Sequence, residues 1–76
     1  MAQRNRKYPQ NVPGSYYVDD TCIDCDVCRS NAPQFFARYD DGGHSYVHRQ
    51  PLTSTELAEA EEARQGCPTD SIGHDG

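Results

Sequence analysis

Four cysteines carry the chemistry of this chain, and three of them stand at intervals of three residues. Cys22, Cys25 and Cys28 lie in the run C-I-D-C-D-V-C, whereas Cys67 follows after 38 further residues and directly precedes Pro68. Cysteines at this spacing in one loop can turn three thiolates toward a single compact object, and a distant fourth can approach it from the opposite side. The spacing therefore predicts a metal centre, with an iron-sulfur cluster as the leading interpretation.

Two other uses of four cysteines have to be weighed. Structural zinc is usually bound by two separated Cys-x2-Cys pairs, so a three-plus-one arrangement fits zinc poorly. Two disulfides would require an oxidising compartment. The first nine residues, M-A-Q-R-N-R-K-Y-P, are charged and contain no apolar run, so we expect no signal peptide and a cytoplasmic protein. In that setting clustered cysteines are more often metal ligands than disulfide partners.

The size and composition of the chain limit what else it can do. With 76 residues, of which 34% are hydrophobic, it can form one small domain whose core is too limited to be stable without a disulfide or a metal. A large substrate pocket does not fit in such a domain, and no pair of residues suggests acid-base catalysis, so we do not expect an enzyme. No stretch approaches the roughly 18 to 20 apolar residues that a membrane span needs.

Charge is distributed unevenly along the chain. The first ten residues carry +3, and the remaining 66 residues combine four basic residues with all twelve acidic ones, a net charge of −8. Nucleic acid is therefore not an expected partner, because phosphate binding depends on clustered lysine and arginine. The better candidate is a protein with a basic docking surface. Six aspartates form either that docking surface or a solvated acidic face: Asp19, Asp20, Asp24, Asp26, Asp40 and Asp41.

The sequence predicts a series of short secondary-structure elements. We expect residues 1–13 to be a flexible N-terminal arm and residues 14–76 to be a single domain. Residues 16–18 favour a strand that leads to Cys22. A short helical turn after Cys28 should end before Pro33. Residues 35–39 and 44–48 then read as two strands of a hairpin, because Asp-Asp-Gly-Gly separates them.

A helix is predicted between the hairpin and the fourth cysteine. Thr53 and Glu56 have the spacing of a capping box, residues 57–65 are mostly good helix formers, and Gly66 stands where the helix should end. The apolar stripe of this helix consists of Leu57, Ala60 and Ala63. Ile72 then begins a short terminal extended segment. The predicted fold class is α+β, with two short antiparallel β elements and two helices around one metal centre.

The two cysteine motifs resemble those of a known family. The run C-I-D-C-D-V-C, the later C-P-T-D-S-I and the strand before Cys22 are similar to the low-potential bacterial ferredoxins with a single [4Fe-4S] cluster, over about residues 14–76. In two-cluster relatives the first motif continues to a fourth cysteine, which is followed by proline. That fourth cysteine ligates the other cluster. Here Ala32-Pro33 stands at that point, and the segment before Cys67 lacks a second cysteine run. The resemblance therefore implies one cluster.

The resemblance also implies a function. It implies one [4Fe-4S] cluster held by Cys22, Cys25, Cys28 and Cys67, cycling between the +2 and +1 core states. The chain would pass low-potential electrons from a reductase to an acceptor oxidoreductase such as a cytochrome P450, as a cytoplasmic monomer. A redox- or iron-sensing module and a zinc-stabilised interaction domain are the alternatives.

Several other residues could be given a role, and for most of them a structural role is the simpler interpretation. Histidines 44, 48 and 74 are expected at the surface, since four thiolates already complete the site. The aromatic residues of the predicted strands are expected to pack in the core. Ile23 and Ile72 are expected to shield the metal centre from water.

Overall fold

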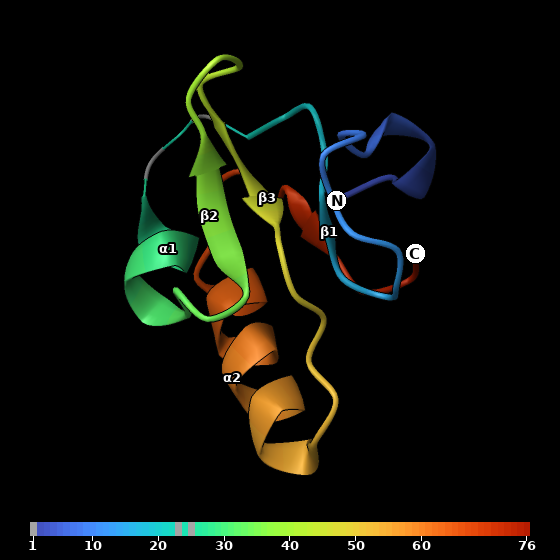
Figure 1. Ribbon diagram of the computed structural model, residues 1–76, viewed down its shortest axis with the longest axis vertical. Helices are drawn as coiled ribbons and strands as arrows, with labels where there is room; N and C mark the ends of the chain where they lie inside the picture. The colour runs from blue at the N-terminus through green and yellow to red at the C-terminus, as the bar shows by residue number, and fades with distance from the viewer. Residues whose placement is uncertain (1, 23, 25) are drawn as a thin grey trace.

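The structure is a computed structural model that describes residues 2–22, 24 and 26–76. Two small antiparallel sheets and two helices make up the described part of the chain, which confirms the predicted α+β class (Figure 1). A 3₁₀ helix, η1 Arg4–Arg6, comes first, and is followed by β1 Tyr17–Val18, α1 Val27–Asn31, β2 Phe36–Tyr39, β3 His44–Val47, α2 Ser54–Gln65 and β4 Ile72–Gly73. Predictions for Ile23 and Cys25 lie outside the described residues.

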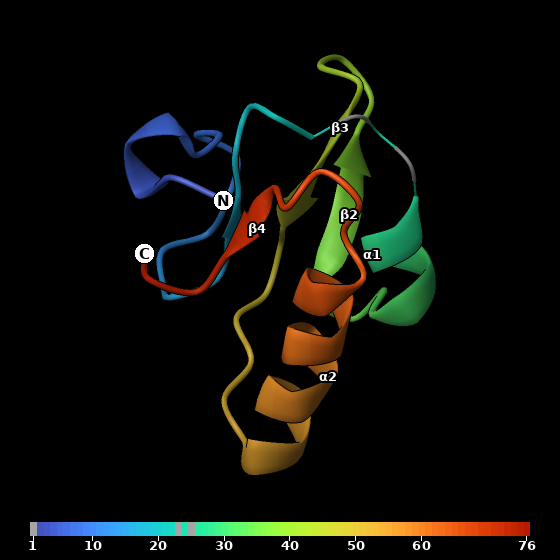
Figure 2. The same ribbon diagram turned by 180° about the vertical axis from the view of Figure 1, so that it is seen from behind.

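The first sheet joins the beginning of the domain to its end. In β1, Tyr17 pairs with Gly73 and Val18 pairs with Ile72, so the strand that precedes Cys22 lies beside the strand that follows Cys67 (Figure 2). Gly73 is required here because the ring of Tyr17 occupies the space that a Cβ atom would need. This pairing brings two parts of the chain that carry cysteines to the same region of the molecule.

The predicted hairpin is confirmed as the second sheet. Phe36 in β2 pairs with Val47 in β3, and the register continues to the pair of Tyr39 and His44. The turn closes when the Gly43 N–H donates to the Tyr39 carbonyl at 2.9 Å. Gly43 has a φ of 66°, which glycine adopts without steric cost. Local turn chemistry therefore determines the shape of this sheet.

Helix α2 begins with the predicted capping box. The Thr53 hydroxyl accepts a hydrogen bond from the Glu56 N–H at 3.1 Å, and the Glu56 carboxylate accepts one from the Thr53 N–H at 3.2 Å. Ala60 and Ala63 are fully buried, whereas Leu57 is 44% exposed, so its place on the buried stripe was predicted wrongly. Figure 1 shows that the first turn of α2 extends beyond both sheets, so the sheets do not cover it.

Replacing Thr53 by alanine is expected to lower the stability of the cluster-loaded protein by about 1 kcal/mol, because one N–H of the first turn loses its partner. For a domain of this size that corresponds to a fall in Tm of about 4–8 °C per kcal/mol. Thermal unfolding monitored by circular dichroism would measure it. Thr55→Ala, an exposed change inside the same helix, is the matched control and should leave Tm nearly unchanged; equal losses in both variants would contradict the role of the cap.

The core lies between the two sheets and the two helices. Phe35, Phe36 and Val47 are at most 2% exposed, which confirms the predicted packing role of both phenylalanines. Ala32 follows the last residue of α1; its N–H donates to the Cys28 carbonyl at 2.8 Å, and the residue is fully buried. Because Cys28 belongs to the same buried cluster, the core directly supports one of the predicted ligands.

Residues 2–13 lie against the rest of the domain. Lys7 forms an isolated bridge with Asp19, the Tyr8 N–H donates to the Val18 carbonyl at 3.0 Å, and the Gln3 N–H donates to the Asp19 carboxylate at 3.0 Å. These contacts place the N-terminal segment beside β1. The division of the chain at residue 13 and the flexibility of the arm stay predictions.

Candidate metal centre

Three of the four predicted ligands line one cavity. Cys22 comes from the segment after β1, Cys28 from α1, and Cys67 from the turn after α2; all three are free thiols. Cys28 is buried, and the other two are half-buried. The remaining walls are apolar or hydroxyl-bearing: Val18, Ser45, Thr69, Ser71 and Ile72. Cys25 lies outside the described residues.

The loop between Cys22 and Cys28 curls through two aspartates in the left-handed backbone region. Asp24 has a φ of 59° and Asp26 a φ of 72°. Aspartate is one of the few residues besides glycine that adopts this conformation readily. The Asp24 N–H then donates to the Cys22 sulfur at 3.4 Å. The aspartates of the motif thus shape the loop, a role that was not predicted although their positions between the cysteines could have suggested it.

The turn after α2 supports Cys67 in a similar way. The Ser71 N–H donates to the Cys67 sulfur at 3.3 Å, and Thr69 Oγ1 lies 3.5 Å from it. Burial acts to raise the pKa of Cys67, but hydrogen bonds to its sulfur, that of the Ser71 N–H first among them, outweigh burial and the pKa is lowered. For Cys28, burial dominates and the pKa is raised, although the hydrogen bond with Ser45 acts against it. The fold therefore stabilises the thiolate of Cys67 better than that of Cys28.

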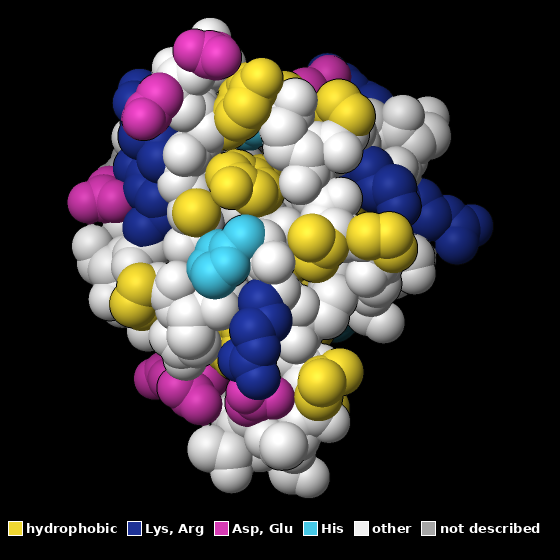
Figure 3. All heavy atoms as spheres, in the orientation of Figure 1, with side chains coloured by type: hydrophobic (Ala, Val, Ile, Leu, Met, Phe, Trp, Pro, Cys, Tyr) yellow, Lys and Arg dark blue, Asp and Glu magenta, His cyan; other side chains and the backbone are white. Residues whose placement is uncertain are grey.

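Ion pairs surround the cysteine loop. Arg29 contacts Asp24 at 2.7 Å and Asp26 at 2.7 Å, and Arg38 contacts Asp24 at 3.0 Å and Asp40 at 2.7 Å. Hydrogen bonds from Arg29 and then Arg38 lower the pKa of Asp24. Basic and acidic side chains interleave over α1 and the hairpin on the face shown in Figure 3. Asp20 is paired as well, with Arg6 at 2.9 Å, so four of the six predicted surface acids form ion pairs within the protein.

The structure also places the other residues that the sequence singled out. Ile72 is 2% exposed and lines the cavity, as predicted. Asp19 is 1% exposed and therefore belongs to neither a solvated face nor a docking surface. His44 was wrongly expected at the surface: it is buried because Tyr8, from the N-terminal segment, stacks on its ring with the centroids 3.4 Å apart. His48 and His74 are exposed, as predicted.

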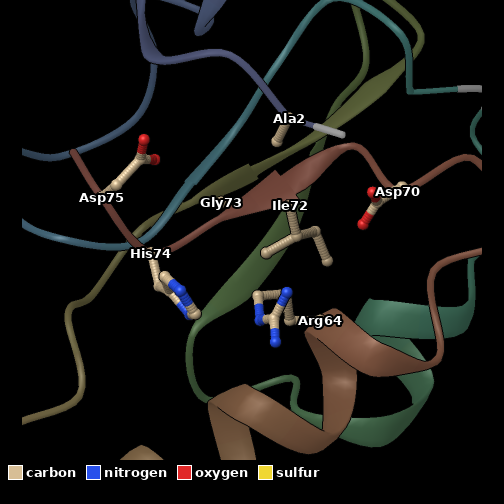
Figure 4. Close-up of a pocket in the computed structure, with 7 residues that line it drawn as sticks. All are labelled: Ala2, Arg64, Asp70, Ile72, Gly73, His74 and Asp75. Atoms are coloured by element: carbon tan, nitrogen blue, oxygen red, sulfur yellow. The ribbon is translucent and has the colours of Figure 1, made fainter.

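A larger cavity of about 80 Å³ lies away from the cysteines, beside β4 and the end of α2 (Figure 4). Arg64 and His74 line it, and both already contact the Glu61 carboxylate, Arg64 through Nε at 2.8 Å and His74 through Nδ1 at 3.2 Å. Hydrogen bonds from Arg64 first, and from His74 and Tyr16, lower the pKa of Glu61. These contacts connect α2 to both strands of the first sheet, at the end where Tyr17 pairs with Gly73.

The cysteine cavity fits an iron-sulfur cluster by the chemistry of its donors. Its volume is about 10 Å³, near the least that one water molecule needs, so empty space does not decide the fit. The donor set does, because soft thiols with N–H donors at their sulfurs and apolar neighbours suit iron-sulfur clusters. Within the described residues, no three His, Cys, Asp or Glu side chains are grouped so as to hold one metal ion. The described part of the chain also contains no helix able to cross a membrane.

Known proteins are similar to this chain in sequence and in fold. Residues 18–74 match the family described as the 4Fe-4S single cluster domain of Ferredoxin I. A ferredoxin from Thermococcus litoralis is 40% identical over 53 residues, which cover 70% of this chain and 83% of that protein. A ferredoxin from Bacillus subtilis (strain 168) is 39% identical over 59 residues, which cover 70% and 71%.

The crystal structure of ferredoxin I from Desulfovibrio africanus superimposes with a TM-score of 0.66 at 40% identity, covering 75% of this chain and 88% of that one. This likeness confirms the fold predicted from the sequence. Together, the matched family, the two relatives and the arrangement of the cysteines identify the type of protein. The chain belongs to the family of the 4Fe-4S single cluster domain of Ferredoxin I, and is an iron-sulfur electron carrier rather than an enzyme.

Proposed function

We propose that this chain carries one electron at a time on a single [4Fe-4S] cluster bound by Cys22, Cys25, Cys28 and Cys67. The observation that carries the proposal is the convergence of Cys22, Cys28 and Cys67 on one cavity from three separate segments of the chain. Cys25 completes the set by its place in the sequence, midway between two residues that line the cavity. Four thiolates provide one ligand for each iron of a four-iron core.

The residues around the cavity have distinct tasks in this function. When bound, the cluster supplies the one-electron redox chemistry. Val18 and Ile72 line the cavity with apolar surface and limit the approach of water. The N–H groups of Asp24 and Ser71 point at ligand sulfurs and stabilise their negative charge. The protein therefore controls orientation, solvent access and charge at the site.

Two features support a single cluster. Ala32, at the point where two-cluster relatives have a further cysteine, is fully buried in the same core as Phe35, Ala60 and Ala63. Helix α2 provides two of these residues and occupies the stretch of sequence that would carry a second cysteine run. Its alanines close the core on this side.

The proposal extends to the reduction potential of the cluster and to the redox partner proteins. A low reduction potential is supported by the formal charge of −5, since negative charge opposes the addition of an electron. The exposed acids, among them Asp40, Asp41 and Glu62, suit reductases and acceptors with basic docking surfaces, a cytochrome P450 or another oxidoreductase being one such acceptor. Free thiols at the site suit a reducing cytoplasm, and a monomer is the form we assign to the carrier.

Anaerobic purification followed by iron and sulfide analysis tests this function. We expect a brown protein with about four irons and four sulfides per chain. One-electron reduction with dithionite should produce an electron paramagnetic resonance signal that integrates to about one spin. A colourless protein that contains one zinc and no sulfide would overturn the proposal, and about eight irons per chain would overturn the single cluster.

A further inference from the structure

A buried serine stands between one ligand cysteine and an arginine. Ser45 in β3 is 1% exposed and lines the cysteine cavity. Its Oγ lies 3.3 Å from the Cys28 sulfur and accepts a hydrogen bond from Arg29 Nη1 at 2.8 Å. The Ser45 hydroxyl therefore approaches the sulfur from β3, whereas Cys28 itself belongs to α1.

The direction of the hydrogen bond between Ser45 and Cys28 depends on whether the sulfur carries a proton. A free Cys28 thiol can donate its proton to Ser45, as in this structure. A thiolate has no proton to give and can only accept. Because Arg29 occupies one lone pair of the Ser45 oxygen, the hydroxyl proton remains available and points to the sulfur. The positive charge of Arg29 also makes that hydroxyl a stronger donor.

We propose that Ser45, polarised by Arg29, is a positioning residue that raises the reduction potential by donating a hydrogen bond to the Cys28 thiolate. This inference rests on the proposed cluster. Hydrogen bonds to ligand sulfurs stabilise the more negative, reduced state and so raise the potential. One electron enters on reduction and no proton has to move.

Contacts with neighbouring side chains hold Arg29 in place. Its side chain is 13% exposed and is held by Asp24 and Asp26, each at 2.7 Å. Two ion pairs therefore hold the guanidinium beside Ser45. Ser45 receives a donor that is fixed before the electron arrives, which is the requirement for a constant effect on the potential.

The hydroxyl of Thr69 lies beside Cys67 and provides a matched control, because its proton is used elsewhere. Thr69 Oγ1 lies 2.6 Å from Ser71 Oγ, which lies 2.7 Å from Thr21 Oγ1, which lies 2.5 Å from the buried carboxylate of Asp19. A carboxylate can only accept, so the protons of all three hydroxyls point toward Asp19. None is left for the Cys67 sulfur, and removal of the Thr69 hydroxyl should change the potential little.

The test compares reduction potentials of cluster-loaded variants, measured by dithionite titration with electron paramagnetic resonance detection. Ser45→Ala is expected to lower the potential clearly, and Thr69→Val much less. Arg29→Lys keeps the charge but cannot reach Ser45 and both aspartates at once, so it should also lower the potential. The potential of the double variant Ser45→Ala/Arg29→Lys should differ little from that of Ser45→Ala. Both changes act on the same hydrogen bond, the one from Ser45 to the Cys28 sulfur, so their effects should not add.

The outcomes separate this inference from the proposed function. Absence of a cluster from the unmodified protein overturns the function itself. A wild-type cluster whose potential is unchanged by Ser45→Ala overturns the inference, as does an equal decrease in Thr69→Val. Full additivity in the double variant would overturn the link between Arg29 and Ser45. Iron analysis and circular dichroism of each variant confirm that a loaded, folded protein is being compared.

Discussion

Replacement of Cys67 by alanine is expected to abolish assembly of the cluster and to unfold much of the chain. Cys67 is the one ligand that approaches from beyond α2, so its loss removes the link that the cluster makes between the end of α2 and the Cys22–Cys28 loop. Only 34% of the residues are hydrophobic, and in so small a domain metal binding and folding are coupled. Iron and sulfide content, visible absorption and circular dichroism would measure the loss.

Pro68→Ala is the matched control for this change. It alters an exposed residue next to Cys67 and leaves the thiol in place, so cluster content should stay near that of the wild type. Retention of a stable four-iron cluster and a native fold in Cys67→Ala would show that Cys67 is not a ligand. A total loss in Pro68→Ala as well would show that the effect belongs to the turn rather than to the sulfur.

Phe35→Ala has the second large expected effect. Phe35 is fully buried at the centre of the core, between α1 and the hairpin, and truncation of such a side chain costs about 3–5 kcal/mol. At about 4–8 °C per kcal/mol, the thermal midpoint of the loaded protein should fall by more than about 12 °C. Anaerobic thermal unfolding followed by cluster absorption and circular dichroism measures this change.

Leu52→Ala serves as the control for Phe35→Ala. Leu52 is 79% exposed, and surface changes of this kind usually alter stability by less than about 0.5 kcal/mol. A loss as large as that of Phe35→Ala would mean that Leu52 packs against a second protein. A nearly unchanged midpoint in Phe35→Ala would mean that the cluster, rather than the core, determines the stability of this domain.

The elements that the sequence predicted best are those determined by neighbouring residues. The Asp-Asp-Gly-Gly turn and the pair of Thr53 and Glu56 act within a few residues, and both appear as expected. The errors concern contacts between distant segments. Leu57 is exposed because α2 extends past the sheets, and His44 is buried because Tyr8 comes from the N-terminal segment. Neither fact can be inferred from local pattern.

At the metal centre, too, the sequence predicted features set by neighbouring residues and missed contacts between distant segments. Cysteine spacing predicted a shared centre because three ligands are neighbours in sequence, and the structure brings Cys22 and Cys28 together with Cys67. Ser45 was missed because a lone serine in a strand carries no signal until its neighbours in space are known. Its contact with Cys28 depends on how the hairpin packs on α1. The left-handed aspartates were readable in principle from their places between the cysteines.

The orientation of α2 has a consequence for how motion is distributed in the molecule. The helix begins in solvent, directly after its cap Thr53, and ends at Gln65, two residues before Cys67, with its buried alanines in the second half. Local fraying can therefore open the first turn without moving a ligand, whereas opening the last turn would displace Cys67. Amide hydrogens should exchange quickly at the start of the helix and slowly at its end. The cluster would thus be insulated from the most labile part of the helix that supports it.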